Sequence, residues 1–210
     1  WAGKDSEVSQ LATWRPFSDE SCPWFDPFWM FGVTPSNPSL ARGGTGGVDV
    51  VLGNPPYVRQ EAIKHLKADL KNYQVYTGTS DLYTYFYESG FNLLKEQGIL
   101  AFITSNKWMR AKYGEKLRAF FLEQTRLLQL IDFKGKPVFD ATVDANILLF
   151  KKGTDQSATV WVGGDLPTTE KPLQPLAQSL LNKQAFVLGD EKIHALKAKI
   201  EAKGTPLKEW

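Results

Sequence analysis

A short apolar run that stops at two consecutive prolines constrains the fold of this chain more than any other feature. Residues 48–53, Val-Asp-Val-Val-Leu-Gly, are rich in the β-branched side chains that buried parallel strands favour. The next four residues are Asn54, Pro55, Pro56 and Tyr57. Each proline fixes its φ angle and lacks a backbone N–H, so the chain cannot continue as a central strand. The sequence therefore predicts a buried strand that ends abruptly in a rigid loop.

Helical and strand patterns alternate after this loop. An apolar stripe at helical spacing begins at Leu82 and reaches Gln97, with Ser80 as the predicted N-cap and Gly98 as the end of the helix. Residues 99–105, Ile-Leu-Ala-Phe-Ile-Thr-Ser, then read as a second buried strand. Two more strands are predicted downstream, at residues 127–133 and 145–151. Strand, helix and strand in this order predict an α/β fold with a mostly parallel sheet.

The loop of residues 54–57 carries groups suited to activating an amino group. Sites in open α/β sheets form beyond the carboxyl ends of the strands. There, the side-chain oxygen of Asn54 and the carbonyl of Pro55 can accept both N–H groups of a conjugated amine, which localises its lone pair as charge develops. Tyr57 can stack on a planar substrate. The alternative is a simple turn that ends the strand, because Asn and Pro both favour turns.

The string Asn-Pro-Pro-Tyr-Val-Arg-Gln-Glu at residues 54–61 resembles motif IV of amino-group methyltransferases that use S-adenosyl-L-methionine. It is most similar to adenine-N6 DNA methyltransferases of the Eco57I-like and type IIG restriction-modification and phage-defence group. The resemblance extends from residue 24 to residue 152. It implies that Asn54 and Pro55, in the motif with Pro56, bind the exocyclic amine of a flipped adenine in double-stranded DNA. It also implies that Tyr57 stacks on that base.

Further site residues follow from the same resemblance. Residues 80–83 resemble motif V, which implies cofactor contacts at Asp81 and Tyr83; core and helix-cap roles are the alternatives. Residues 136–142 resemble motif VIII, which implies that Phe139 stacks on the base opposite Tyr57. A buried loop side chain is the alternative for Phe139.

A basic segment with interleaved aromatic residues follows the second strand. Lys107 and Arg110 precede a helix predicted from residue 113 to residue 124, and they are candidates for contacts to phosphates or bases of the substrate. Lys116 and Arg118 lie within that helix, where we expect an ordinary charged surface.

The resemblance implies a partial Rossmann-like methyltransferase sheet with one antiparallel element and flanking helices. It also implies a Gly-rich cofactor loop upstream of the motif, and residues 1–47 contain no strand followed by a suitable glycine turn and helix. We therefore expect the main S-adenosyl-L-methionine loop to lie in an upstream part of a longer parent chain. We expect residues 1–210 by themselves to bind the cofactor weakly or not at all, and to be inactive.

Three segments differ in composition. Residues 1–47 are an irregular lead-in rich in aromatic residues and glycine, and the resemblance implies that residues 48–155 form the catalytic half of a methyltransferase domain. Residues 156–210 read as a linker and the start of a target-recognition or accessory region. Within this last segment we expect an edge strand at residues 159–162 and an amphipathic helix at residues 190–202.

Composition limits the other classes of function. The chain has one cysteine, Cys22, and two histidines, which are too few for a typical zinc site, so we expect no metal centre. No apolar run reaches transmembrane length. We therefore expect a cytoplasmic protein with no membrane partner. The net charge of +2 does not by itself identify a nucleic-acid-binding protein.

Two other readings remain open. The same loop serves methyltransferases that act on protein glutamine side chains or on RNA, because a carboxamide nitrogen needs the same activation. A degenerate methylase half could also act as a non-catalytic DNA-docking module. The resemblance further allows a nuclease domain elsewhere in the parent chain, although no nuclease constellation stands out in these 210 residues.

Overall fold

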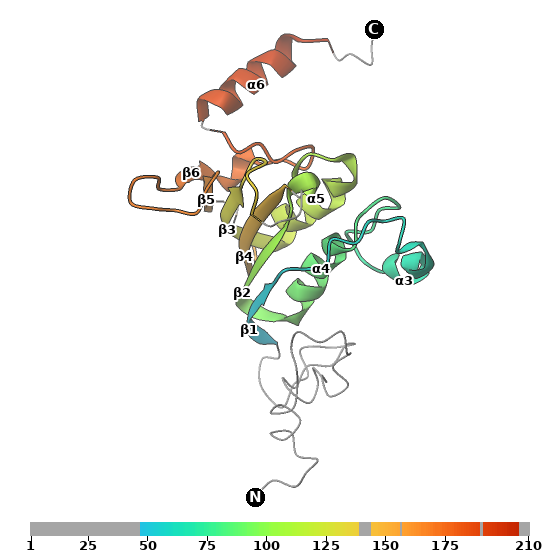
Figure 1. The fold of residues 1–210 in the computed structure, drawn as a ribbon. Coiled ribbons are helices and arrows are strands. Elements are labelled where there is room, and N and C mark those ends of the chain that lie inside the picture. The colour runs from blue at the N-terminus through green and yellow to red at the C-terminus, as the bar shows by residue number, and fades with distance from the viewer. Residues whose placement is uncertain (1–46, 139–143, 156, 190, 206–210) are drawn as a thin grey trace, which may run out of the picture. The chain divides into compact units, whose positions relative to one another are not determined.

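The computed structural model describes residues 47–138, 144–155, 157–189 and 191–205, so the predicted lead-in lies almost entirely outside the described residues. The described strands form a six-stranded sheet in the order β1-β2-β4-β3-β5-β6 (Figure 1). These strands are β1 Val48–Gly53, β2 Leu94–Ser105, β3 Thr125–Asp132, β4 Ala145–Lys152, β5 Thr159–Gly163 and β6 Gln174–Ala177.

Four of the six strands run in one direction. The pairs β1–β2 and β3–β5 are parallel, β4 is antiparallel to both β2 and β3, and β6 is antiparallel to β5. The predicted mostly parallel α/β sheet with flanking helices is confirmed. It contains two reversed strands, β4 and β6, where the sequence predicted one. Strands β1, β2, β3 and β5 point the same way, so their carboxyl ends all lie along one side of the sheet. We call this line of strand ends the carboxyl edge.

Two helices, α4 Tyr83–Leu93 and α5 Glu115–Gln124, cover one face of the sheet and form the main core with it. The ring of Phe91 on one helix contacts the ring of Phe120 on the other, with centroids 5.1 Å apart, and Phe150 of β4 packs beneath Phe91. A Cβ atom on Gly90 would lie 2.5 Å from Leu100, so glycine lets the first helix approach the sheet closely. The helices are α3 Lys67–Leu70, α4 Tyr83–Leu93, α5 Glu115–Gln124 and α6 Glu191–Lys203, with 3₁₀ turns η2 Lys64–Leu66, η3 Asn106–Met109, η4 Lys112–Gly114 and η5 Gln178–Leu180.

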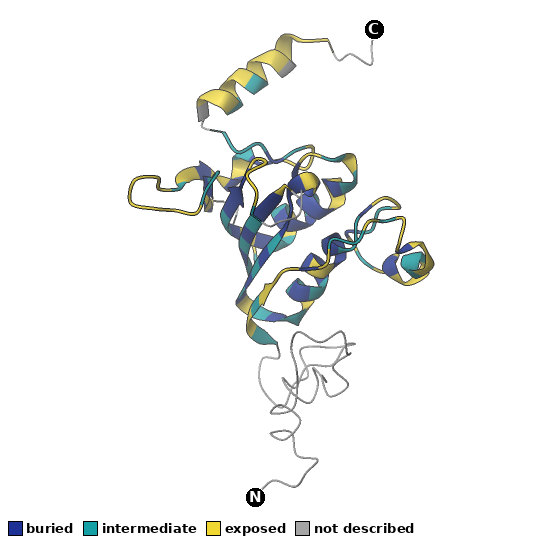
Figure 2. Ribbon diagram, in the orientation of Figure 1, coloured by how far each residue is buried: buried dark blue, intermediate teal, exposed yellow. Residues whose placement is uncertain are grey.

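The opposite face of the sheet is covered less completely by the described residues (Figure 2). A small cluster around Ile131, Phe133 and Ala145 packs there. Strand β1 lies at the edge of the described sheet, and Val50 and Leu52 are 52% and 74% exposed. The prediction that this strand is buried is therefore wrong for the described residues. Apolar composition identified the strand, but it could not show how many neighbours cover it.

The ends of α4 also differ from the prediction. Its N-cap residue is Leu82, whereas Ser80, the predicted cap, is buried in the preceding turn. The helix ends at Leu93, four residues before Gln97, and β2 begins at once with Leu94. Gln97 has a φ angle of 67°, so the backbone turns within the segment predicted to be helical.

The sheet continues past residue 155. Strand β5 pairs with β3 on one side and β6 on the other, so the prediction of an edge strand at residues 159–162 is wrong. The helix predicted at residues 190–202 is confirmed as α6, and its apolar side chains Ile193, Leu196 and Ile200 are exposed. A separate accessory region from residue 156 stays a prediction. No helix within the described ranges is long and apolar enough to cross a membrane.

Candidate active site

The loop of residues 54–57 leaves the sheet at its carboxyl edge. Strand β1 ends at Gly53, which pairs with Phe102 of β2. A Cβ atom on Gly53 would lie 3.0 Å from the Phe102 ring, so the two strands meet closely where the loop begins. Asn54 is exposed and Pro55 is buried. The amide of Asn54 is therefore accessible beside a loop that is anchored by the neighbouring proline.

Tyr57, in the same loop, is held in a defined position. Its hydroxyl donates a hydrogen bond of 3.3 Å to the backbone carbonyl of Ile103 on β2. Its ring meets Tyr83 edge to face, with centroids 6.3 Å apart and an interplanar angle of 86°. Partial burial raises the pKa of the Tyr57 phenol above its usual value, so the ring stays neutral at physiological pH. A neutral ring fixed in this way suits stacking on a planar substrate.

The two predicted cofactor residues support this tyrosine. Tyr83 is 1% exposed, and its hydroxyl lies 2.9 Å from that of Tyr113. Burial is the main reason why the pKa of Tyr83 is raised. Asp81 accepts a hydrogen bond of 3.1 Å from the backbone N–H of Gln60, which ties the segment after Tyr57 to the start of α4. Direct contacts of Asp81 and Tyr83 with a cofactor stay a prediction.

A buried carboxylate connects two other loops at the same edge, and sequence reasoning missed it. Asp132, the last residue of β3, is fully buried. It accepts a hydrogen bond of 2.7 Å from the Asn106 side chain and one of 3.1 Å from the Arg110 guanidinium. It also accepts the backbone N–H of Lys134 at 3.2 Å. The sequence did contain a signal for this role, because Asp132 is an acidic residue at the end of an apolar strand, and strand ends on this side of the sheet face the site.

The predicted substrate contacts Lys107 and Arg110 lie in the segment after β2, which Asp132 holds through Asn106 and Arg110. Lys107 is exposed, and its backbone N–H is capped by the Ser105 hydroxyl at 3.4 Å. The Arg110 side chain is 62% exposed although one of its nitrogens pairs with Asp132. Its remaining donors can therefore reach a phosphate. Phe139 lies outside the described residues, so its stacking role stays a prediction.

Arg118 does not lie on a charged surface as predicted. It is 1% exposed and donates to backbone carbonyls from two separate segments of the chain. The acceptors are Lys183 at 2.7 Å, Ala111 and Gln184 at 2.9 Å each, and Trp108. The guanidinium thus joins the segment after β2 to the segment before α6. Lys116, two residues earlier on α5, is exposed as predicted.

Several known proteins have sequences similar to this chain. A family model described as Eco57I restriction-modification methylase matches residues 6–139. The Type II methyltransferase M.BstVI of Geobacillus stearothermophilus is 33% identical over 65% of this chain and 25% of that protein. The Type II restriction enzyme and methyltransferase RM.Eco57I of Escherichia coli is 34% identical over 49% of this chain and 11% of that protein.

The third relative is the adenine-specific methyltransferase BrxX of Escherichia coli O9:H4 (strain HS), 33% identical over 39% of this chain and 7% of that protein. The chain therefore spans a quarter or less of the length of these relatives. The family match covers more than half of the 210 residues and includes the loop of residues 54–57. The chain belongs to the Eco57I restriction-modification methylase family.

Proposed function

We propose that the parent protein is a site-specific DNA adenine-N6 methyltransferase of a restriction-modification or phage-defence system. In this proposal, the chain supplies the substrate side of the catalytic domain. The observation that carries the proposal is the fixed position of Tyr57, which bonds to the Ile103 carbonyl and meets the Tyr83 ring, in the same loop as the exposed Asn54. The names of the relatives, two methyltransferases and an adenine-specific methyltransferase, agree with it.

The loop would act on the amino group of a base that has left the duplex. The Asn54 side-chain oxygen and the Pro55 carbonyl accept its two N–H groups, and Pro56 keeps the loop rigid. The nitrogen would become more pyramidal, and its lone pair would form the new N–C bond while the methyl–sulfur bond of S-adenosyl-L-methionine breaks and the sulfur leaves as a neutral thioether. The proton leaves the nitrogen for water after the attack, so no strong base is needed. These hydrogen bonds strengthen as positive charge develops on nitrogen, and they therefore lower the barrier.

Stacking would hold the flipped base in register. The Tyr57 ring offers one aromatic face, and Phe139 is proposed for the other. Base–aromatic stacking contributes about 1–3 kcal/mol per base, which is similar to the few kcal/mol needed to unstack one. Lys107 and Arg110 are proposed to contact the nearby backbone of double-stranded DNA.

When bound, S-adenosyl-L-methionine supplies an electrophilic methyl group. The residues near Tyr57 fit this cofactor only in part. Asp81 is half-exposed and its carboxylate can accept from a hydroxyl or an amine, whereas the Tyr83 hydroxyl already bonds to Tyr113. We propose that the main cofactor loop lies upstream in the parent chain. Calorimetry on residues 1–210 should then give weak or no binding, and tight binding would contradict this part of the proposal.

The experiment is methyl transfer from radiolabelled S-adenosyl-L-methionine to duplex DNA by the full-length parent, followed by nucleoside analysis. We expect label in N6-methyladenine. Asn54→Ala should lower turnover by about 10²–10³-fold, as expected when one preorganised transition-state hydrogen bond is removed. Asn72→Ala, at another exposed asparagine, is the control and should leave turnover unchanged. Label on protein or RNA in place of DNA would refute the proposal.

A further inference from the structure

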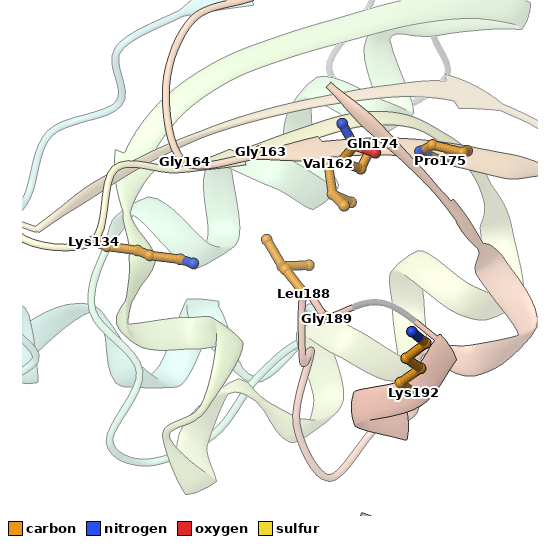
Figure 3. Close-up of a pocket in the computed structure, with 9 residues that line it drawn as sticks. All are labelled: Lys134, Val162, Gly163, Gly164, Gln174, Pro175, Leu188, Gly189 and Lys192. Carbon is orange, nitrogen blue, oxygen red and sulfur yellow. The ribbon is translucent and has the colours of Figure 1, made fainter. Parts of the chain in front are cut away.

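A pocket of about 650 Å³ opens beyond β5, away from the loop of residues 54–57. Its walls come from four places: the turn after β3, the end of β5, the start of β6, and the segment that leads into α6 (Figure 3). Lys134 extends into it from the turn, and Lys192 contributes from the first turn of α6. Gly163, Gly164 and Leu188 form other parts of the wall. This volume is typical of a ligand site.

The charge around the pocket is positive. Both lysine side chains are exposed, and none of the nine residues that line the pocket is acidic. Asp165, which follows Gly164, is occupied by an ion pair with Lys136, with Nζ 2.6 Å from Oδ1. Two cationic groups therefore face one hollow that is otherwise glycine backbone, apolar side chains and an amide. Such a surface favours an anionic ligand.

The turn that carries Lys134 is held in an unusual backbone conformation. Lys134 has a φ angle of +50°, which side chains other than glycine and asparagine rarely adopt, and Gly135 follows at +80°. The buried Asp132 carboxylate accepts the Lys134 N–H and fixes the start of the turn. A strained residue that its neighbours hold in place is a reason to look for a function. The turn directs this lysine into the pocket.

We propose that this pocket binds a phosphodiester of the DNA that flanks the target base, with Lys134 and Lys192 as its cationic contacts. The inference rests on the proposed function, because it takes duplex DNA as the substrate. Strand β5 is four strand spacings from β1 in the sheet order, which is about 19 Å at about 4.8 Å per spacing. That distance corresponds to about six steps along one strand of a duplex at about 3.4 Å each. The pocket would therefore contact the flank and not the flipped base.

The test uses the full-length parent and a duplex without a target site. The dissociation constant is measured by fluorescence anisotropy over a range of sodium chloride concentrations. The double variant Lys134→Gln, Lys192→Gln should bind several-fold more weakly at low salt. Its slope of log affinity against log salt should be shallower by about 1 for each phosphate that the protein no longer neutralises. Lys151 lies near the carboxyl end of the reversed strand β4, on the side of the sheet opposite the carboxyl ends of β3 and β5. Lys151→Gln is therefore the control, and it should change neither the dissociation constant nor the salt slope.

Lys134→Asn is a second variant, because asparagine tolerates the positive φ angle and should keep the fold while removing one charge. An unchanged salt slope in both Lys134 variants would overturn the inference. So would saturable binding of inorganic phosphate that needs both lysines but leaves the DNA affinity unchanged at constant ionic strength, since the ligand of the pocket would then be free phosphate and not DNA. Nucleoside analysis of the unmodified parent tests the proposed function separately. N6-methyladenine with unchanged salt slopes would reject only the pocket.

Discussion

Replacing Arg118 by Met should open the contact between the segment after β2 and the segment before α6. Methionine fills a similar volume but donates no hydrogen bonds, so four backbone carbonyls lose their donor. A buried acceptor left without a partner costs about 1–3 kcal/mol. The residues at two of these carbonyls, Lys183 and Gln184, are exposed, so water can replace the guanidinium there. The Ala111 carbonyl keeps a second donor, the N–H of Gly114 at 3.1 Å, so the remaining loss, at Trp108, is about 2 kcal/mol, or about thirtyfold in the opening equilibrium.

Hydrogen exchange of the parent protein measures this opening directly. The backbone N–H of Phe186 donates to the Met109 carbonyl at 2.9 Å, so it reports whether the two segments stay together. In Arg118→Met, peptides that contain Phe186 should exchange about thirtyfold faster, while peptides from β4 should not change. Lys116→Met, on an exposed position of the same helix, should have no effect. An increase of less than about threefold at Phe186 would refute the reasoning that the buried guanidinium holds this segment.

Three further results are expected. Gly114→Ala should lower the free energy of unfolding of the parent by about 3 kcal/mol, which a lower melting temperature would show. The reason is that a Cβ atom at residue 114 would clash with the Trp108 carbonyl oxygen. Tyr57→Phe keeps the ring but loses the bond to Ile103, worth about 1 kcal/mol, so single-turnover methylation should fall less than about tenfold, whereas Tyr57→Ala should cost more. Burial raises the pKa of Tyr57 and of Tyr83, so the folded state favours the neutral form of each phenol. Their contribution to stability is therefore complete below about pH 10 and is lost as the pH rises further. Thermal unfolding measured between about pH 8 and about pH 11 can check this loss.

Strands were easier to predict from this sequence than the ends of helices. The runs at residues 99–105, 127–133 and 145–151 are apolar and bounded by polar or turn-forming residues, and each is a strand in the structure. The helix before β2 was predicted to reach Gln97 because Leu93 and Leu94 continue its apolar stripe. Periodicity cannot show that Leu94 already pairs with Val48 of β1.

The candidate site divides in the same way. The loop of residues 54–57 is visible in the sequence because its chemistry is local to four adjacent residues. The roles of Asp132 and Arg118 depend mainly on partners that are 22 or more residues away, so no local pattern reveals them. In the sequence, Arg118 looks like the exposed Lys116, because both are basic residues on the same predicted helix. Only the packing of the segment at residues 183–184 over it decides that it is buried.

The reversed strand β4 gives this fold a place to acquire new specificity. Strands β3 and β4 are consecutive and antiparallel, so the connection between them, residues 133–144, starts and ends at the edge that carries the loop of residues 54–57. Strand β4 is two strand spacings from β1, about 10 Å. Sequence inserted into this connection would emerge at the side of the sheet that carries the loop of residues 54–57 without changing the register of any strand, since loops tolerate insertions better than the elements they join. Under the proposed function, evolution or protein engineering would then alter what is read next to the target base while the loop of residues 54–57 stays the same.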